Sequence, residues 1–112
     1  MAHYLITLLL PDRAATCLDV REDEMILAAA YQAGLALPSM CLQGWCITCA
    51  GLVEGAGEWD QSAARRYFSA DREAGFILLC TAQPRSNLCI RTHQRIAMRD
   101  HRLSRSLPTP HG

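Results

Sequence analysis

The chain has 112 residues and a formal net charge of zero; 50% of its residues are hydrophobic and 20% are charged. This composition indicates one globular domain with a modest core and excludes a disordered chain. The balanced charge excludes the overall basic character of a nucleic-acid-binding protein. No apolar run approaches the roughly 18–20 residues that a membrane span requires. The opening run from Tyr4 to Leu10 lacks a basic start and a cleavage pattern, so it is expected to be a strand and not a signal peptide.

The first predicted elements are two strands, over residues 3–10 and about 14–20, on either side of a turn at Pro11-Asp12-Arg13. A helix is predicted from Glu24 to Ala33, with Asp23 as its N-cap and Gly34 just after its end. Apolar residues recur along this segment with helical spacing, so it is expected to pack one face against the core.

The second half of the chain is predicted to be built from shorter elements. After a loop from Leu37 to Cys49 we expect, in order, a strand at Ala50–Val53, an extension at Gly55–Trp59, a helical stretch at about Ala63–Arg72 behind Asp60-Gln61-Ser62, an apolar strand at Phe76–Thr81 and a last strand at Asn87–Arg91.

Charge divides the chain into two parts. All eleven basic residues are arginine. Residues 1–94 hold ten acids and seven arginines, which gives −3, whereas residues 95–112 hold four arginines and one aspartate, which gives +3. We therefore predict a domain over residues 1–94 and a basic, flexible C-terminal extension over 95–112, with a short helix at most around Ile96–Arg102.

Six cysteines stand at positions 17, 41, 46, 49, 80 and 89. Without a signal peptide, metal or redox chemistry is favoured over a disulfide framework. Cys41, Cys46 and Cys49 form a C-x4-C-x2-C pattern, and Gly44 permits the tight turn that would let them surround one group. Cys80 follows thirty residues later and is expected to arrive from a separate strand.

Four interpretations of these cysteines remain open. A [2Fe–2S] cluster with plant-type ligand spacing fits every interval. A structural zinc site needs two close cysteine pairs, and Cys80 has no close partner along the chain. A thioredoxin-like C-x2-C pair would leave the other two cysteines unexplained. In the last interpretation, these four cysteines are buried, inert thiols. We adopt the same interpretation for the other two cysteines, Cys17 and Cys89, which lie in apolar, strand-like runs.

Further motifs surround the cysteines. They are Ile26-Leu27-Ala28-Ala29-Ala30 before Gly34, Leu37-Pro38-Ser39-Met40-Cys41, Cys49-Ala50-Gly51, Trp59-Asp60-Gln61-Ser62, Ala74-Gly75-Phe76-Ile77-Leu78-Leu79-Cys80, Pro84-Arg85-Ser86 and Ile90-Arg91-Thr92-His93. With these motifs the chain resembles the plant-type [2Fe–2S] ferredoxins of chloroplasts and cyanobacteria over about residues 3–94. Adrenodoxin-like ferredoxins have one more residue between the first two cysteines and fit less well.

The resemblance implies an α+β fold, namely a β-grasp (ubiquitin-like) mixed sheet with one main helix and a cluster-binding loop. It implies one [2Fe–2S] cluster, with Cys41 and Cys46 on the iron nearer the surface and Cys49 and Cys80 on the inner iron. The protein would then be a carrier of single electrons and not an enzyme.

The sequence departs from that family at two positions that serve in docking. Where the family commonly has acids and an exposed aromatic residue, this chain has Arg65 and Arg66, followed by Tyr67-Phe68. Where the family usually has an acidic pair near its C-terminus, Gln94-Arg95-Ile96 stands here. These departures argue against the usual docking to ferredoxin–NADP reductase and predict a specialised member with a different partner.

The expected function is that of a soluble, monomeric electron carrier between a reductase or photosystem and acceptor enzymes, with no nucleic acid and no membrane span. The alternative is a regulatory or sensing iron–sulfur protein whose C-terminal tail binds a control partner. Because the sequence shows no transit segment, we expect a bacterial, cyanobacterial cytoplasm, with the plastid stroma as the other location.

Overall fold

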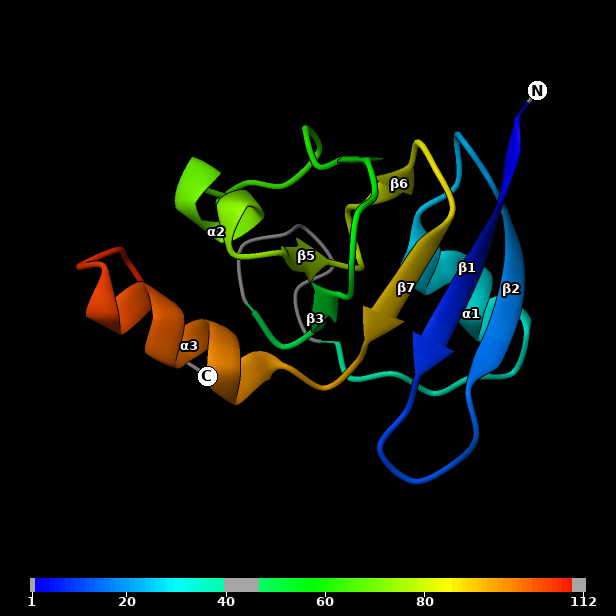
Figure 1. Ribbon diagram of the computed structural model, residues 1–112, viewed down its shortest axis with the longest axis horizontal. Helices are drawn as coiled ribbons and strands as arrows, with labels where there is room; N and C mark the ends of the chain where they lie inside the picture. The colour runs from blue at the N-terminus through cyan, green and yellow to red at the C-terminus, as the bar shows by residue number, and fades with distance from the viewer. Residues whose placement is uncertain (1, 40–46, 110–112) are drawn as a thin grey trace.

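Figure 1 shows a mixed sheet with helix α1 beside strands β1 and β2, and with helices α2 and α3 at the opposite end of the molecule. The computed structural model describes residues 2–39 and 47–109. The helices are α1 (Ile26–Gln32), α2 (Ser69–Glu73) and α3 (Arg95–Ser104). The strands are β1 (His3–Leu9), β2 (Thr16–Arg21), β3 (Ala50–Val53), β4 (Trp59–Asp60), β5 (Phe76–Leu78), β6 (Gln83–Pro84) and β7 (Leu88–Arg91).

The main sheet has the strand order β2-β1-β7-β3-β5, and β4 pairs with β6 in a separate two-stranded sheet. Strands β1 and β7 are parallel, with Ile6 opposite Leu88, and all other pairs are antiparallel. Strands β1 and β7, the first and last along the chain, therefore lie side by side inside the sheet, although 82 residues separate Ile6 from Leu88. This is the predicted β-grasp α+β fold.

Alternation along β1 and β2 explains how this end of the sheet forms its core. Ile6 and Leu8 on β1 and Leu18 and Val20 on β2 are buried, and the residues between them are exposed or half-buried. This period of two places one apolar face of the hairpin against α1. The two predicted strands are confirmed, with β2 starting at Thr16.

Helix α1 is confirmed but shorter than predicted. It is followed by Gly34 at φ +85°, the left-handed conformation expected just after a helix end. The predicted N-cap is wrong, because Met25 and not Asp23 occupies that position, and it makes no side-chain capping bond.

The start of α1 is closed by a distant turn instead. The N–H of Ile26 donates to the carbonyl of Ala82 at 2.9 Å, and the N–H of Leu27 donates to the carbonyl of Leu79 at 3.0 Å. These bonds satisfy donors that a side chain would otherwise have to cap. They also attach the helix to the residues on both sides of Cys80.

The helical stretch predicted at Ala63–Arg72 is wrong over most of its length, because α2 covers only Ser69–Glu73. The Asp60 carboxylate accepts bonds from the Ser62 N–H at 2.8 Å and the Ser62 hydroxyl at 2.5 Å. This local side-chain bonding favours a turn over a helix, and α2 starts only after Phe68.

The predicted short helix near the C-terminus is present as α3 and extends from Arg95 to Ser104. It contacts α2 and β3. Its Met98 and Arg102 side chains are fully buried. The division of the chain into a domain over residues 1–94 and an extension over 95–112 stays a prediction. None of the three helices in the described part of the chain has the length and apolar composition of a membrane span.

Candidate metal centre

Antiparallel pairing of β3 and β5 brings two predicted ligands together. Ala50, at the start of β3, lies opposite Leu78, at the end of β5. Cys49 comes just before β3, and Cys80 comes two residues after β5, so both thiols lie at the same end of this strand pair. Their Sγ atoms are 3.3 Å apart, and both side chains are buried. That separation is far longer than the ~2.05 Å of a disulfide bond.

The two thiols fit the ligand set of an iron–sulfur group. Two thiolates on one tetrahedral ion with metal–sulfur bonds of about 2.3 Å lie about 3.8 Å apart, so a small separation of the two sulfurs from the observed 3.3 Å would accommodate the ion. Sulfur is the soft, anionic donor that an iron–sulfide core prefers. The other two predicted ligands, Cys41 and Cys46, lie outside the described residues, so their part of the prediction is not tested.

A buried hydroxyl next to Cys49 fits the same kind of group. The Oγ1 atom of Thr48 is buried and has no hydrogen-bond partner among the residues that the structure describes. A buried donor needs an acceptor, and hydrogen bonds from nearby donors to cluster sulfur are a means by which proteins tune such groups.

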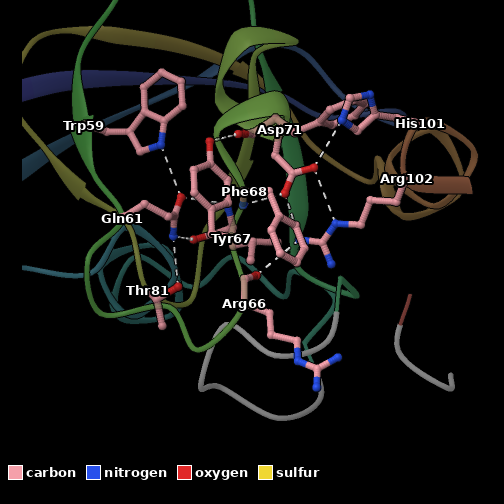
Figure 2. A network of polar contacts seen from close by, with 11 residues as sticks. Trp59, Gln61, Arg66, Tyr67, Phe68, Asp71, Thr81, His101 and Arg102 are labelled. Atoms are coloured by element: carbon pink, nitrogen blue, oxygen red, sulfur yellow. Dashed lines mark hydrogen bonds and ion pairs between the residues drawn. The ribbon is translucent and has the colours of Figure 1, made fainter. Parts of the chain in front are cut away.

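A buried glutamine bonds to residues on both sides of Cys80, and Figure 2 shows its contacts with Trp59 and Thr81. The Gln61 side-chain amide donates to the Leu78 carbonyl and to the Thr81 hydroxyl, each at 2.9 Å. Its carbonyl oxygen accepts bonds from the Leu78 N–H and the Trp59 indole N–H, each at 3.1 Å. One side chain therefore ties the end of β5 to the residue after Cys80.

Replacing Gln61 with leucine should destabilise the Cys80 turn by about 2–3 kcal/mol. The change removes the Gln61 acceptor of the buried Leu78 N–H and one partner of the Thr81 hydroxyl, and a buried group that loses its partner costs about 1–3 kcal/mol. Hydrogen exchange of the β5 amides measures the loss. Gln83→Leu is the matched control. The Gln83 amide donates to the Asp23 carbonyl at 3.2 Å in an exposed position, so its loss should change protection much less. Equal effects of the two variants would contradict this role of Gln61.

Asp60, beside Gln61, is held ionised. Hydrogen bonds from the hydroxyl and the N–H of Ser62 lower the pKa of Asp60, and the nearby charge of Arg85 lowers it further. The carboxylate contacts the Arg85 guanidinium at 3.2 Å. This pair joins β4 to the residue after β6, so the predicted motifs around Asp60 and Arg85 meet in space.

A second buried network attaches α3 (Figure 2). The Asp71 carboxylate on α2 accepts a bond from the Arg102 guanidinium at 3.0 Å. It also accepts one from the Phe68 N–H at 2.9 Å. The Nε2 atom of His101 lies 3.1 Å from the carboxylate without the angle of a hydrogen bond. Asp71 and Arg102 are both fully buried, so this ion pair lies within the core.

Sequence reasoning missed this ion pair and the role of Gln61. The sequence contains the Asp60-Gln61-Ser62 motif, but nothing in it shows that the glutamine turns inward. Arg102 was counted among the basic residues of the tail. The interpretation of Cys17 as a buried thiol is wrong, because its side chain is exposed on β2; Cys89 is half-buried.

Comparisons with known proteins agree with this geometry. Residues 10–85 match the 2Fe-2S iron-sulfur cluster binding domain. The chain is 37% identical over 94 residues to Ferredoxin-2 from a Synechococcus strain, covering 84% of this chain and 88% of that protein. It is 42% identical over 77 residues to the heterocyst ferredoxin of Microchaete diplosiphon, covering 69% and 77%.

Among solved structures, the crystal structure of Pectocin M2 superposes with a TM-score of 0.74 at 29% identity. The match covers 85% of this chain but only 34% of the Pectocin M2 chain, so the present chain spans about a third of that protein.

These matches decide between the interpretations that the cysteine spacing left open. An iron–sulfur family covering most of the chain favours one [2Fe–2S] cluster over zinc, a reactive dithiol or inert cysteines. Two buried sulfurs at ligand spacing agree with it. The chain belongs to the plant-type [2Fe–2S] ferredoxin family and is a carrier of single electrons, not an enzyme.

Proposed function

We propose that Cys41, Cys46, Cys49 and Cys80 together bind the [2Fe–2S] cluster. The observation that carries this proposal is the 3.3 Å separation of the Cys49 and Cys80 sulfur atoms. Their burial supports the assignment of this pair to the inner iron. Cys41 and Cys46 complete the plant-type spacing of the ligands.

The bound cluster supplies reversible one-electron chemistry. The chain's own residues exclude water and hold the geometry. Buried Cys49 and Cys80 keep the inner side of the site dry, while Gln61 and the start of α1 fix the turn around Cys80. We infer that these contacts keep the frame alike in both oxidation states, which favours rapid electron transfer.

A reductive titration tests the carrier function. Stepwise addition of dithionite to the purified holoprotein, followed by visible absorption, should bleach the cluster bands with the uptake of one electron per chain. The reduced protein should then pass that electron to an added acceptor and recover its spectrum. Uptake of two electrons, or bleaching that no oxidant reverses, would contradict a carrier of single electrons.

The natural partners are redox proteins, a reductase as donor and enzymes as acceptors. We infer that ferredoxin–NADP reductase is not the main partner, because arginines stand at the two positions where the family has docking acids. The cytoplasm of a bacterium, or the stroma of a plastid, suits a protein whose relatives are cyanobacterial and chloroplast ferredoxins. Affinity for that reductase equal to that of an acidic ferredoxin would contradict the inference about docking.

A further inference from the structure

Charge is segregated in this molecule, although its formal total is zero. Residues 61–73 and 94–109 contain seven arginines and three acids, which gives +4. The remaining residues contain four arginines and eight acids, which gives −4. The two positive segments are neighbours, because the Arg102 guanidinium donates to the Arg66 carbonyl at 3.2 Å and α3 contacts α2. The α2–α3 end is therefore a positive pole.

The outer side of α3 combines this charge with exposed apolar surface. Ile96 and Leu103 are 61% and 55% exposed and supply two of the four exposed large apolar side chains in the described part of the chain. They stand seven residues apart, two helical turns, so they share one side of the helix. Arg99, which is exposed, lies between them on that side.

This side of α3 begins next to the candidate metal centre. The N–H of Gln94 donates to the carbonyl of Ala50 at 3.0 Å, and Ala50 directly follows Cys49. Helix α3 starts at the next residue, Arg95. A partner seated on Ile96 and Arg99 would therefore be held close to the inner ligands, as electron transfer between proteins requires.

We propose that Arg65, Arg66, Arg95 and Arg99, together with Ile96 and Leu103, form a docking surface for a redox-partner protein with an acidic surface around an apolar centre. We call these six residues the arginine surface. The proposal rests on the cluster site proposed above and adds which kind of surface the partner must have. The apolar pair supplies desolvated contact area and the arginines supply orientation and steering. The recognition polarity is the reverse of that of an acidic ferredoxin, so the partner must carry the carboxylates.

Two haem proteins of opposite charge serve as test acceptors, namely acidic cytochrome b5 and basic cytochrome c. Stopped-flow mixing with the reduced holoprotein gives the second-order rate constant for each at low and high ionic strength. For Arg99→Glu, the rate with cytochrome b5 should fall by about tenfold at low salt, and the effect should shrink at high salt, where charges are screened. The rate with cytochrome c should stay level or rise. Ile96→Ser should slow cytochrome b5 at both salt concentrations.

Matched controls lie away from α3. Arg13→Glu makes the same charge change in the exposed turn between β1 and β2, and Leu5→Ser removes an apolar side chain that is 50% exposed on β1. Figure 1 shows that turn well away from α3. Neither control should change the rate with cytochrome b5 more than about twofold, because both residues lie outside the docking surface and a charge farther from the partner's carboxylates interacts with them more weakly.

Each outcome bears on one claim. Equal slowing by Arg99→Glu and Arg13→Glu, or no slowing by Arg99→Glu, would overturn the arginine surface while leaving the cluster site intact. The visible spectra of the unmodified protein and of each variant are recorded first. Absence of cluster bands in the unmodified protein would overturn the proposed cluster site and not the arginine surface.

Discussion

Replacing Cys80 with alanine is expected to abolish stable cluster binding. Cys80 is buried and its sulfur lies 3.3 Å from that of Cys49, so its loss removes one of the two thiols that the described residues bring together. Removal of a residue that merely supports a metal ligand already costs about 10–100-fold in affinity, and loss of the ligand itself should cost more. Iron and acid-labile sulfide per chain, with the visible absorption of the purified variant, measure the result.

The control for this change is Cys17→Ala. Cys17 is exposed on β2, where its sulfur contacts the Thr7 hydroxyl at 3.6 Å. This variant should retain the full cluster. A Cys80→Ala protein that keeps as much iron and sulfide as the Cys17→Ala protein would refute the proposed ligand set. Far-ultraviolet circular dichroism of both variants distinguishes loss of the ligand from loss of the fold.

The largest expected effect on stability belongs to Arg102. Changing it to methionine should reduce the free energy of opening of the α2–α3 region by about 3–5 kcal/mol, because the buried Asp71 carboxylate loses its charged partner. Asp71 would keep the Phe68 N–H at 2.9 Å, but one amide does not neutralise a carboxylate. Native-state hydrogen exchange of the α2 and α3 amides measures the change while the cluster stays bound.

Two further variants distinguish the effect of losing the ion pair from the effect of changing any arginine of α3. Arg99→Met removes an exposed arginine from the same helix and should change the free energy of opening by less than about 0.5 kcal/mol. The double variant Asp71→Leu with Arg102→Met removes both charges and should recover most of the loss. Unchanged exchange in Arg102→Met would show that the ion pair does not hold α3 in place.

Much of the fold could be predicted from local patterns. The alternation in β1 and β2 is a property of neighbouring residues, and so is the turn at Gly34. Two predictions, the N-cap of α1 and the helical stretch at Ala63–Arg72, were wrong, and tertiary contacts take part at both places. The start of α1 is closed by carbonyls of Leu79 and Ala82 rather than by Asp23. The segment before α2 combines the local turn between Asp60 and Ser62 with a glutamine that bonds across to β5.

The candidate site shows the same contrast. The spacing of the cysteines and their surrounding motifs were enough to predict the cluster and the transfer of single electrons, because ligand type and loop length are local properties of the sequence. The set of four ligands stays a prediction. Only the tertiary structure decided that α3 packs on the domain through a buried Asp71–Arg102 pair, that the Arg102 side chain reaches the Arg66 carbonyl, and that Gln94 bonds to Ala50 next to Cys49. These contacts join residues about thirty or more positions apart. Their energy depends on burial and orientation, which no local pattern of residues specifies.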